Sequence, residues 1–410
     1  MITKLAPTHV PSLVLCALAL SACEPGSLSL GHDDPTDGDT ETDTDGDPAT
    51  EGEVRWSTLR PDATAFDLAV APDGSFYLLG FLGLHPAGDG HYYDQLWLGK
   101  HDADGGLLWE LTEPSGVDAS VFPVAVTTDP LGNVYFSTVG YDESVDGDNR
   151  VRKLDANGNE LWSISMPGRA SALAGLPEGG VIVGGSQDSL AWVQPVDPDG
   201  NLGWSRTFGD PNMRYSEVTA VSVTADGGVA VGGRLGIDPG SSRSQAWAAT
   251  LERLDGATRW ETLVTDAIAT DRIHDQGLAA DGTLLLAGWG DAPWVKALAT
   301  NGSEQWTWIN DAAPGTYRLA VFPDGGFAVG DGLYLDPEDP NGCWEGPGPC
   351  PVAMRISRLE ADRSTRWSLY REDCRSADHL RPTADGGLLA TATCELDGGG
   401  LGVGVFRLEP

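Results

Sequence analysis

The sequence predicts an all-β fold, a seven-bladed β-propeller whose blades are four-stranded antiparallel sheets. Three observations lead to this prediction. A unit with two tight turns recurs along the chain, seven tryptophans occupy one position of that unit, and the two ends of the repeat region complement each other. The repeat covers residues 53–410, and the residues before it have a different composition.

Each repeated unit opens with an apolar strand that ends in a tight turn, as in Ala71-Pro72-Asp73-Gly74. A second apolar strand follows directly. A third strand, a second tight turn and a tryptophan strand complete the unit, as in the run from Lys153 to Trp162. Asp-Gly and Asn-Gly dipeptides form hairpin turns because these residues tolerate positive φ. Four short strands in a unit of about 40–60 residues are typical of a propeller blade.

The number of blades follows from the tryptophans at the end of the unit, which are Trp56, Trp109, Trp162, Trp204, Trp260, Trp306 and Trp367. The first turns also number seven if Asp129-Pro130-Leu131-Gly132 is a version one residue longer. The last unit ends at Pro410, where its tryptophan strand should begin. Residues 53–59 supply that missing strand, so we expect the N-terminal strand to complete the last blade. Such closure removes exposed strand edges.

The hairpin that runs from Asp155 through Gly158 to Trp162 resembles the tryptophan-docking motif of the bacterial PQQ-like and related β-propeller repeats. The resemblance covers about residues 53–410 and implies the fold, whereas this scaffold serves many unrelated functions. The chain lacks the adjacent-cysteine pair of many alcohol-oxidising quinoproteins, and it has one blade fewer than their usual eight. We therefore expect no redox cofactor.

The N-terminus has the pattern of an export signal. Lys4 precedes an apolar run from about Val10 to Leu20, which is shorter than the ~20 residues that a membrane-spanning helix needs. The run ends in Leu20-Ser21-Ala22-Cys23, which resembles the bacterial lipobox. The resemblance implies removal of residues 1–22 and lipidation of Cys23, with the outer membrane favoured over the inner. An ordinary signal peptide cleaved near Ala22 is the alternative.

Residues 23–52 follow as an acidic tether. Residues 31–53 contain ten Asp or Glu and no Lys or Arg, so they cannot bury enough apolar surface to offset the entropy of ordering. We expect a spacer between the lipid and the propeller. The net charge of −36 argues against nucleic acid as a partner and against docking of the protein surface on an anionic membrane. Membrane contact is thus expected through the lipid alone.

Four cysteines remain besides Cys16 and Cys23, and all lie near the C-terminus: Cys343, Cys350, Cys374 and Cys394. An even number in an exported protein predicts disulfides. The natural pairs are Cys343 with Cys350 and Cys374 with Cys394. Zinc is the alternative, but no CxxC spacing supports it.

The blade topology separates two faces. Both short turns of each blade lie on one face, and the variable loops lie on the other: 81–95, 140–150, 234–245, 331–351 and 395–402. Functional groups concentrate on variable loops, so we expect the loop face to be the working face. Alignment of the innermost strands places these polar residues at the channel mouth on that face: Asp67, Ser171, Thr219, His274, Asp275, Tyr317, Arg318, Asp378 and His379.

The pairs His274-Asp275 and Asp378-His379 could bind a metal or a polar ligand, and a solvated channel rim is the competing interpretation. Two stretches, 41–46 and 142–148, resemble the start of a calcium loop but lack the acid at position 12. We therefore predict no cofactor and leave only calcium open.

No catalytic motif for a nucleophile, a metalloprotease, a P-loop or a dinucleotide fold is present. The leading hypothesis is a monomeric, non-enzymatic propeller, periplasmic or surface-exposed, that binds or scaffolds an envelope protein or polysaccharide. Its layout resembles the eight-bladed propeller lipoprotein of outer-membrane barrel assembly. The alternative is an exported enzyme or a metal-dependent ligand binder that uses the channel mouth.

Overall fold

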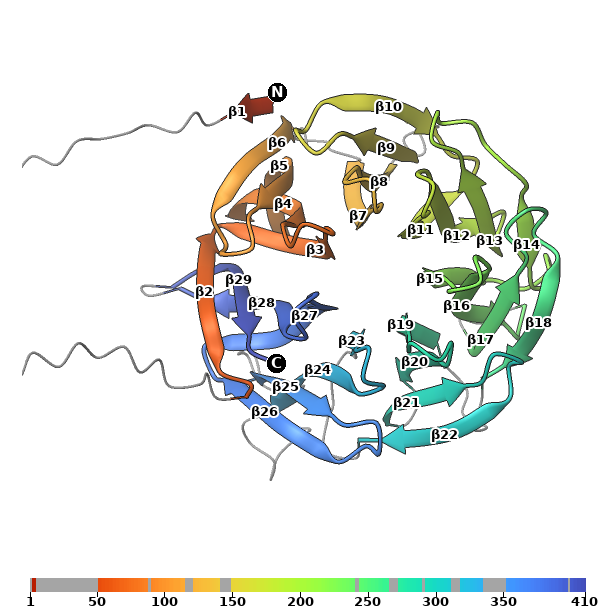
Figure 1. The fold of residues 1–410 in the computed structure, drawn as a ribbon. Helices are drawn as coiled ribbons and strands as arrows, with labels where there is room; N and C mark the ends of the chain where they lie inside the picture. The colour runs from red at the N-terminus through yellow and green to blue at the C-terminus, as the bar shows by residue number, and fades with distance from the viewer. Residues whose placement is uncertain are drawn as a thin grey trace, which may run out of the picture.

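In the computed structural model, seven antiparallel sheets stand around a central axis like the blades of a propeller (Figure 1). The structure describes residues 2–4, 51–87, 90–114, 121–140, 149–239, 243–264, 272–289, 292–310, 318–334, 352–396 and 399–410. Seven blades of four antiparallel strands confirm the predicted fold class. No helix long and apolar enough to cross a bilayer occurs in these ranges.

The strands run from the axis outwards in sequence order. Blade 1 consists of β3 (Ala63–Val70), β4 (Phe76–Ala87), β5 (Gly90–His101) and β6 (Leu107–Pro114). Blade 2 consists of β7 (Val121–Thr128), β8 (Val134–Gly140), β9 (Arg150–Leu154) and β10 (Glu160–Ser165). Blade 3 consists of β11 (Arg169–Gly175), β12 (Val181–Gln187), β13 (Leu190–Val196) and β14 (Arg206–Phe208). Blade 4 consists of β15 (Glu217–Val223), β16 (Val229–Gly236), β17 (Ser244–Leu251) and β18 (Thr258–Leu263). Blade 5 consists of β19 (Arg272–Leu278), β20 (Leu284–Trp289), β21 (Pro293–Leu298) and β22 (Glu304–Ile309). Blade 6 consists of β23 (Arg318–Val321), β24 (Phe327–Tyr334), β25 (Val352–Leu359) and β26 (Thr365–Arg371).

The seventh blade joins the two ends of the chain. It contains β27 (Cys374–Pro382), β28 (Leu388–Glu395), β29 (Leu401–Leu408) and, as its outer strand, β2 (Val54–Pro61). β2 pairs antiparallel with β29, from Val54 opposite Leu408 to Pro61 opposite Gly402. The predicted closure by the N-terminal strand is therefore confirmed. A further strand, β1 (Ile2–Lys4), pairs with β6 at the outer edge of the first blade and lies within the segment predicted to be a signal peptide.

The predicted docking tryptophans fasten each blade to the next. Five of them donate their indole N–H to a carbonyl in the second turn of the following blade: Trp56 to Ala103, Trp109 to Ala156, Trp162 to Pro198, Trp204 to Arg253 and Trp260 to Thr300. The turn must hold a residue without a side chain under the indole. At Gly302 (φ +82°), an added Cβ would lie 2.7 Å from the ring of Trp260.

The last two docking sites vary this arrangement. Arg363 takes the glycine position in the sixth blade with φ 71°, and its guanidinium lies 5.3 Å from the ring centroid of Trp306. Trp367 packs on Gly52, just before β2, so the N-terminal segment docks as well as pairs. The first turn of the second blade, expected to be one residue longer, has the ordinary length. Its bonds from Asp129 N to Asn133 O and from Gly132 N to Asp129 O match those from Ala71 to Ser75 and from Gly74 to Ala71.

The core lies between adjacent sheets. Four tryptophans from third strands are buried there: Trp97, Trp192, Trp247 and Trp294. Trp247 is fully buried and lies 4.6 Å from Phe208 of the preceding blade, centroid to centroid. Aromatic burial of this kind contributes strongly to blade packing. The aromatic content of the chain is therefore largely explained by the fold.

A disulfide joins Cys374 on β27 to Cys394 on β28, which confirms one of the two predicted pairs. Cys343 and Cys350 lie outside the described residues. The bridge fastens the innermost strand of the seventh blade at the end that faces away from the Asp385-Gly386 turn.

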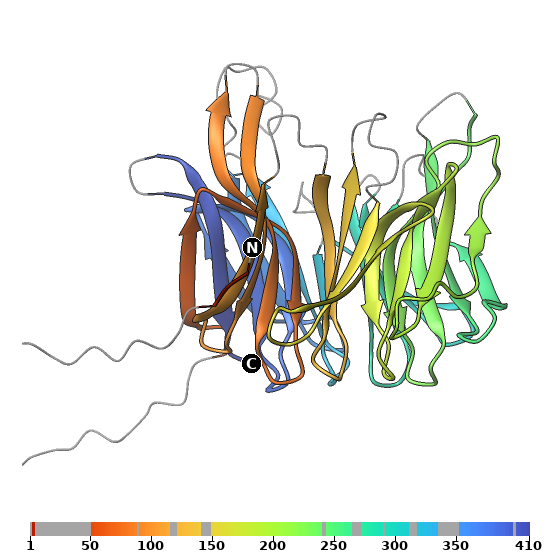
Figure 2. The ribbon, with the colours of Figure 1, turned by 90° about the horizontal axis from the view of Figure 1, so that it is seen from above.

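The two faces of the ring differ (Figure 2). Short first and second turns line one face, and the β4–β5 hairpin rises beyond the ring on the other. Residues 81–95, expected to form a loop, thus belong mainly to paired strands. Glu53, where the propeller begins, accepts a hydrogen bond from Glu409 N, and Pro410 lies against the turn at Gly386. The chain therefore joins the ring on the turn face.

Candidate functional site in the central channel

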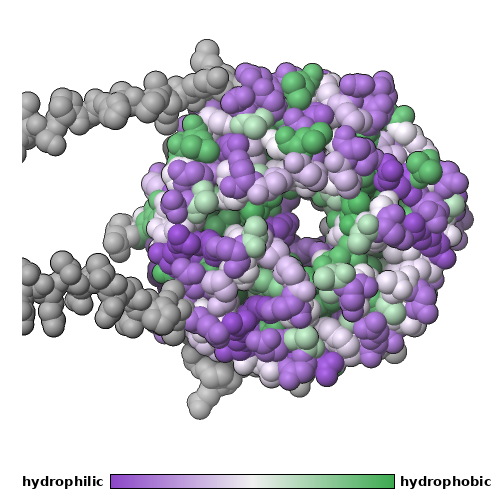
Figure 3. Space-filling model, viewed as in Figure 1, coloured by the Kyte–Doolittle hydropathy of each residue, from purple (hydrophilic) through white to green (hydrophobic). Residues whose placement is uncertain are grey.

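A channel passes through the middle of the ring and is visible as an opening in the space-filling view (Figure 3). Its cavity has a volume of about 630 Å³. The lining comes from the seven innermost strands, which are β3, β7, β11, β15, β19, β23 and β27. Each of these strands contributes a few side chains, so the channel chemistry depends on which residues stand at equivalent positions.

One position, four residues before the first turn, divides the ring into two arcs. Blades 1, 5, 6 and 7 carry charged or titratable residues there: Asp67, Asp275, Arg318 and His379. Blades 2, 3 and 4 carry alanine: Ala125, Ala172 and Ala220. In six of the seven innermost strands, all except β23, the strand register shifts by a bulge just before this position, in both arcs. A bulge changes the direction in which the next side chain points.

Asp67 and Asp275 use this geometry in the same way. Asp67 accepts hydrogen bonds from Leu68 N (2.8 Å) and, in the next blade, from Val126 N (2.9 Å). Asp275 accepts from Gln276 N (2.9 Å) and from Leu319 N of the next blade (3.2 Å). Each carboxylate therefore fastens its own innermost strand to the neighbouring one.

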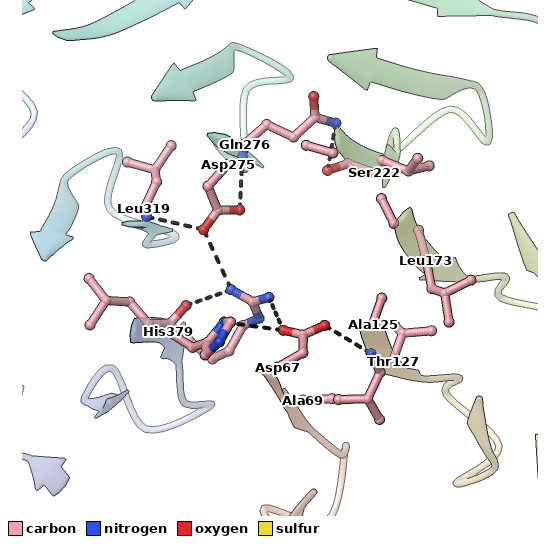
Figure 4. Close-up of a pocket in the computed structure, with 18 of the residues that line it drawn as sticks. Asp67, Ala69, Ala125, Thr127, Leu173, Ser222, Asp275, Gln276, Leu319 and His379 are labelled. Atoms are coloured by element: carbon pink, nitrogen blue, oxygen red, sulfur yellow. Dashed lines mark hydrogen bonds and ion pairs between the residues drawn. The ribbon is translucent and has the colours of Figure 1, made fainter. Parts of the chain in front are cut away.

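Arg381 lies between these two carboxylates (Figure 4). Arg381 Nη2 is 3.1 Å from Asp67 Oδ1. Arg381 Nη1 is 3.7 Å from Asp275 Oδ2 and donates a hydrogen bond to Leu380 O at 2.9 Å. Burial raises the pKa of Asp67, and the charge of Arg381 opposes that shift. The guanidinium thus neutralises carboxylates from blades 1 and 5 from its place in blade 7.

His379 completes this group, which we call the deep cluster: Asp67, Asp275, His379 and Arg381. Its Nδ1 is 3.4 Å from Asp67 Oδ1, and the side chain is almost fully buried. Burial, together with Arg318 and Arg381, lowers the pKa of His379 well below its usual value. The ring is therefore neutral near pH 7, and its contact with Asp67 is not an ion pair.

A second group extends from the same level towards the loop face, and we call it the mouth cluster: Arg234, Arg272, His274 and Arg318. Arg318 stands at the position of Asp275 and His379, and the other three come from residues nearer the loop face. Arg272 Nε donates to His274 Nε2 at 3.1 Å. Arg234 forms an ion pair with Glu217 (3.0 Å), and Arg318 Nε donates to Asp378 O. Burial, together with the charges of Arg272, Arg318 and Arg234, lowers the pKa of His274 to about 3. His274 is thus a neutral base in a cationic surrounding.

The other predicted site residues have structural partners. The Asp378 carboxylate accepts from the hydroxyls of Ser376 (3.0 Å) and Thr393 (2.8 Å), and burial raises its pKa. Ser171 donates to Glu217 Oε1 at 2.6 Å, and Thr219 donates to Ile273 O of the next blade. Tyr317 lies outside the described residues.

The two His-acid pairs do not act as pairs. His274 contacts Arg272 whereas Asp275 binds backbone amides, and His379 faces Asp67 whereas Asp378 faces hydroxyls. In the described ranges, no group of three or more His, Cys, Asp or Glu is placed to hold a metal ion. The calcium-loop fragments at 41–46 and 142–148 lie outside those ranges.

Sequence reasoning missed Arg234, Arg272 and Arg381. Arg381 stands two residues after His379, and side chains two apart share one side of a strand. Arg272 stands two residues before His274, across the bulge. Both could have been found by following period two along the innermost strands. Arg234 comes from the second strand of its blade, and only its pairing with Glu217 in β15 reveals it.

No protein-family model matches this sequence, and no curated protein matches it. Among solved structures, a protein of unknown function from Dyadobacter fermentans matches with a TM-score of 0.52 at 10% identity, covering 88% of this chain and 100% of that chain. BamB from Moraxella catarrhalis matches with a TM-score of 0.48 at 15% identity, covering 84% of this chain and 86% of that chain.

Quinohemoprotein alcohol dehydrogenase from Comamonas testosteroni matches with a TM-score of 0.49 at 13% identity, covering 87% of this chain and 76% of that chain. Likeness at such low identity concerns the fold alone. The fold and the channel together define the class: a seven-bladed β-propeller with a charged central channel.

Proposed function

We propose that this chain is an exported, monomeric envelope propeller, anchored by lipid on Cys23, that binds or scaffolds an envelope protein or polysaccharide without catalysis. The observation that carries the proposal is the face of the ring on which the N-terminal segment joins the propeller. The chain joins the propeller on the turn face, beside Glu409 and Gly386. A tether on that side would direct the opposite face, with its longer connections, away from the membrane and towards partners.

The deep cluster supports a binding role over an enzymatic one. Asp67 and Asp275 each accept two backbone amides and share Arg381. A general base needs a lone pair directed at the proton that it removes, and these carboxylates direct theirs at the frame of the ring. Their arrangement explains them as parts of the scaffold, and the proposed function includes no cofactor. Calcium on the acidic loops stays open.

Within this proposal the lipid anchor lies in the outer membrane rather than the inner, and the domain lies on its periplasmic or its outer side. Substitution of the anchor tests this part of the proposal. Cys23→Ser removes the thiol that is lipidated, so the protein should move from the membrane fraction to the soluble fraction of fractionated cells. Retention of the variant in the membrane fraction would contradict the anchor.

Photo-crosslinking in intact cells tests the working face. A photoreactive residue would replace Ile237 or Gln95, both exposed towards the loop face, and Leu131 on the turn face would serve as the control. Ile237 and Leu131 are exposed apolar residues, 37% and 66% respectively, so their substitution should disturb the fold little. We expect one dominant partner, identified by mass spectrometry, from the loop-face positions only. Crosslinks from Leu131 alone, or identical crosslinks from all three positions, would contradict the proposal.

A further inference from the structure

The mouth cluster concentrates positive charge in a protein whose net charge is −36. Arg272 and His274 lie on β19, Arg318 on β23 and Arg234 on β16. Glu217 is the one described carboxylate that pairs with any of them, and it pairs with Arg234 and accepts from Ser171. Arg272 and Arg318 thus bring two guanidinium groups without carboxylate partners among the described residues.

Two features of the mouth cluster indicate that this concentration of positive charge destabilises the fold. Desolvation and the charges of Arg234 and Arg318 lower the pKa of Arg272, while the charge of Glu217 opposes them, so the charge of Arg272 is compensated only in part. Arg234 Nε is buried and has no hydrogen-bond partner among the described residues. A buried hydrogen-bond donor that has no acceptor lowers the free energy of unfolding. A group that supplied negative charge and acceptor oxygens would relieve both conditions.

The nearby carboxylates do not fill that role. Asp275 directs its oxygens at Gln276 N, Leu319 N and Arg381, and Asp378 directs its oxygens at Ser376 and Thr393. Arg318 meets only the backbone carbonyl of Asp378. Within the described residues, the neighbouring acids Asp275 and Asp378 are therefore used by the frame of the ring.

The protonation of His274 adds a donor. Arg272 Nε always carries its proton, so His274 Nε2 must accept it, and the neutral ring then carries its own proton on Nδ1. That N–H is a third kind of donor beside the guanidinium groups. A metal ion is disfavoured at this nitrogen, because its lone pair is occupied and its surroundings are cationic.

We propose that the mouth cluster is a receptor for an oxyanion, a phosphate or carboxylate group of a small ligand, bound between Arg272 and Arg318 with His274 as an added donor. Guanidinium groups match the planar or tetrahedral oxygens of such anions and bind them through paired hydrogen bonds. His274 and Arg318 also line the channel, whose volume of about 630 Å³ leaves room for a small molecule behind the anionic group. This inference goes beyond the proposed scaffold role and does not depend on it.

Calorimetric titration of the full mature chain with inorganic phosphate and with citrate tests the site. Sodium chloride at matched ionic strength separates specific binding from screening. We expect saturable binding of at least one of the two anions, and the stronger one identifies the class, phosphate or carboxylate. Arg272→Gln should weaken that binding about tenfold or more, since a charge-assisted hydrogen bond is lost.

Arg318→Gln is the second variant and should show the same loss. Arg259→Gln is the matched control, because Arg259 pairs with Asp226 and Glu252 near the turn face and should leave anion binding unchanged. The circular dichroism spectrum of each variant verifies folding. The proposal is overturned if neither anion binds more strongly than chloride, or if both mouth variants bind as tightly as the unaltered protein.

Discussion

The deep cluster and the mouth cluster both contain arginine and histidine, but they differ in how the arginines are paired. In the deep cluster, one guanidinium serves two carboxylates, and each carboxylate also accepts two backbone amides. In the mouth cluster, one of three guanidinium groups pairs with a described carboxylate, that of Glu217, and a neutral imidazole accepts from another. Neighbours rather than residue type therefore decide whether a channel charge supports the ring or remains available to a ligand.

A second contrast lies around the ring. In the charged arc, Asp67 and Asp275 each fasten their blade to the next, whereas in the alanine arc Ser137 and Thr219 do so with hydroxyls. Ser137 accepts from Ala125 N and donates to Ala170 O of the next blade, and Thr219 donates to Ile273 O. The charged arc contains the seventh blade, in which the two ends of the chain meet. The carboxylate fastening thus lies in the same arc as the pairing of β2 with β29 that closes the ring.

Opening the ring should have the largest effect, because both clusters depend on the frame. Deletion of residues 53–59 would remove most of β2 and expose the edge of β29. We expect the truncated protein to aggregate or to lose tens of degrees in Tm, measured by size-exclusion chromatography and calorimetry. An unchanged Tm would refute closure by β2.

Removing a deep carboxylate should have the next largest effect. Asp67→Ala leaves the amides of Leu68 and Val126 without an acceptor and Arg381 with one carboxylate, so we expect a loss of about 2 kcal/mol. Thr219→Val removes one neutral hydrogen bond at an alanine-arc junction and should cost about 1 kcal/mol. Denaturant titration of both variants measures the difference. Equal losses in the free energy of unfolding for the two variants would contradict the distinction between the charged arc and the alanine arc.

The pH dependence of stability separates His274 from the rest of the channel. Its folded pKa of about 3 lies below the ordinary value of 6.5, so the unfolded chain takes up a proton first as the pH falls below 6.5. This contribution is complete above pH 6.5 and is lost on acidification. His274→Gln should therefore lose less stability than the unaltered protein, by about 2 kcal/mol at pH 5. The Tm of both proteins is measured from pH 8 to pH 5 in buffers without polyvalent anions. If the two Tm curves run parallel, the lowered pKa of His274 is contradicted.

The sequence predicted the parts of the fold that repeat. Asp-Gly turns and docking tryptophans recur with a fixed spacing, so the number of blades and the closure by residues 53–59 could be derived by counting. The channel was predicted only in part. The strand alignment found Asp67, His274, Asp275, Arg318 and His379 on the channel lining, but it treated neighbours in sequence as partners in space.

The structure shows why that assumption was wrong. A bulge separates His274 from Asp275 and Asp378 from His379, so the members of each pair point to different neighbours. The actual partners come from other blades, as with Arg381 and Asp275, or from a second strand, as with Arg234 and Glu217. Such contacts depend on the curvature of the ring, which the repeat pattern does not encode.

The most direct test of the two-cluster account compares Arg381→Gln with Arg272→Gln by Tm and by anion affinity. Arg381→Gln should lower the Tm, because Asp67 and Asp275 lose their shared cation, and should change anion affinity less than about twofold, since distant charges are screened. Arg272→Gln should keep or raise the Tm and abolish most of the anion binding. Equal losses of Tm in the two variants, or loss of anion binding in Arg381→Gln alone, would contradict the account.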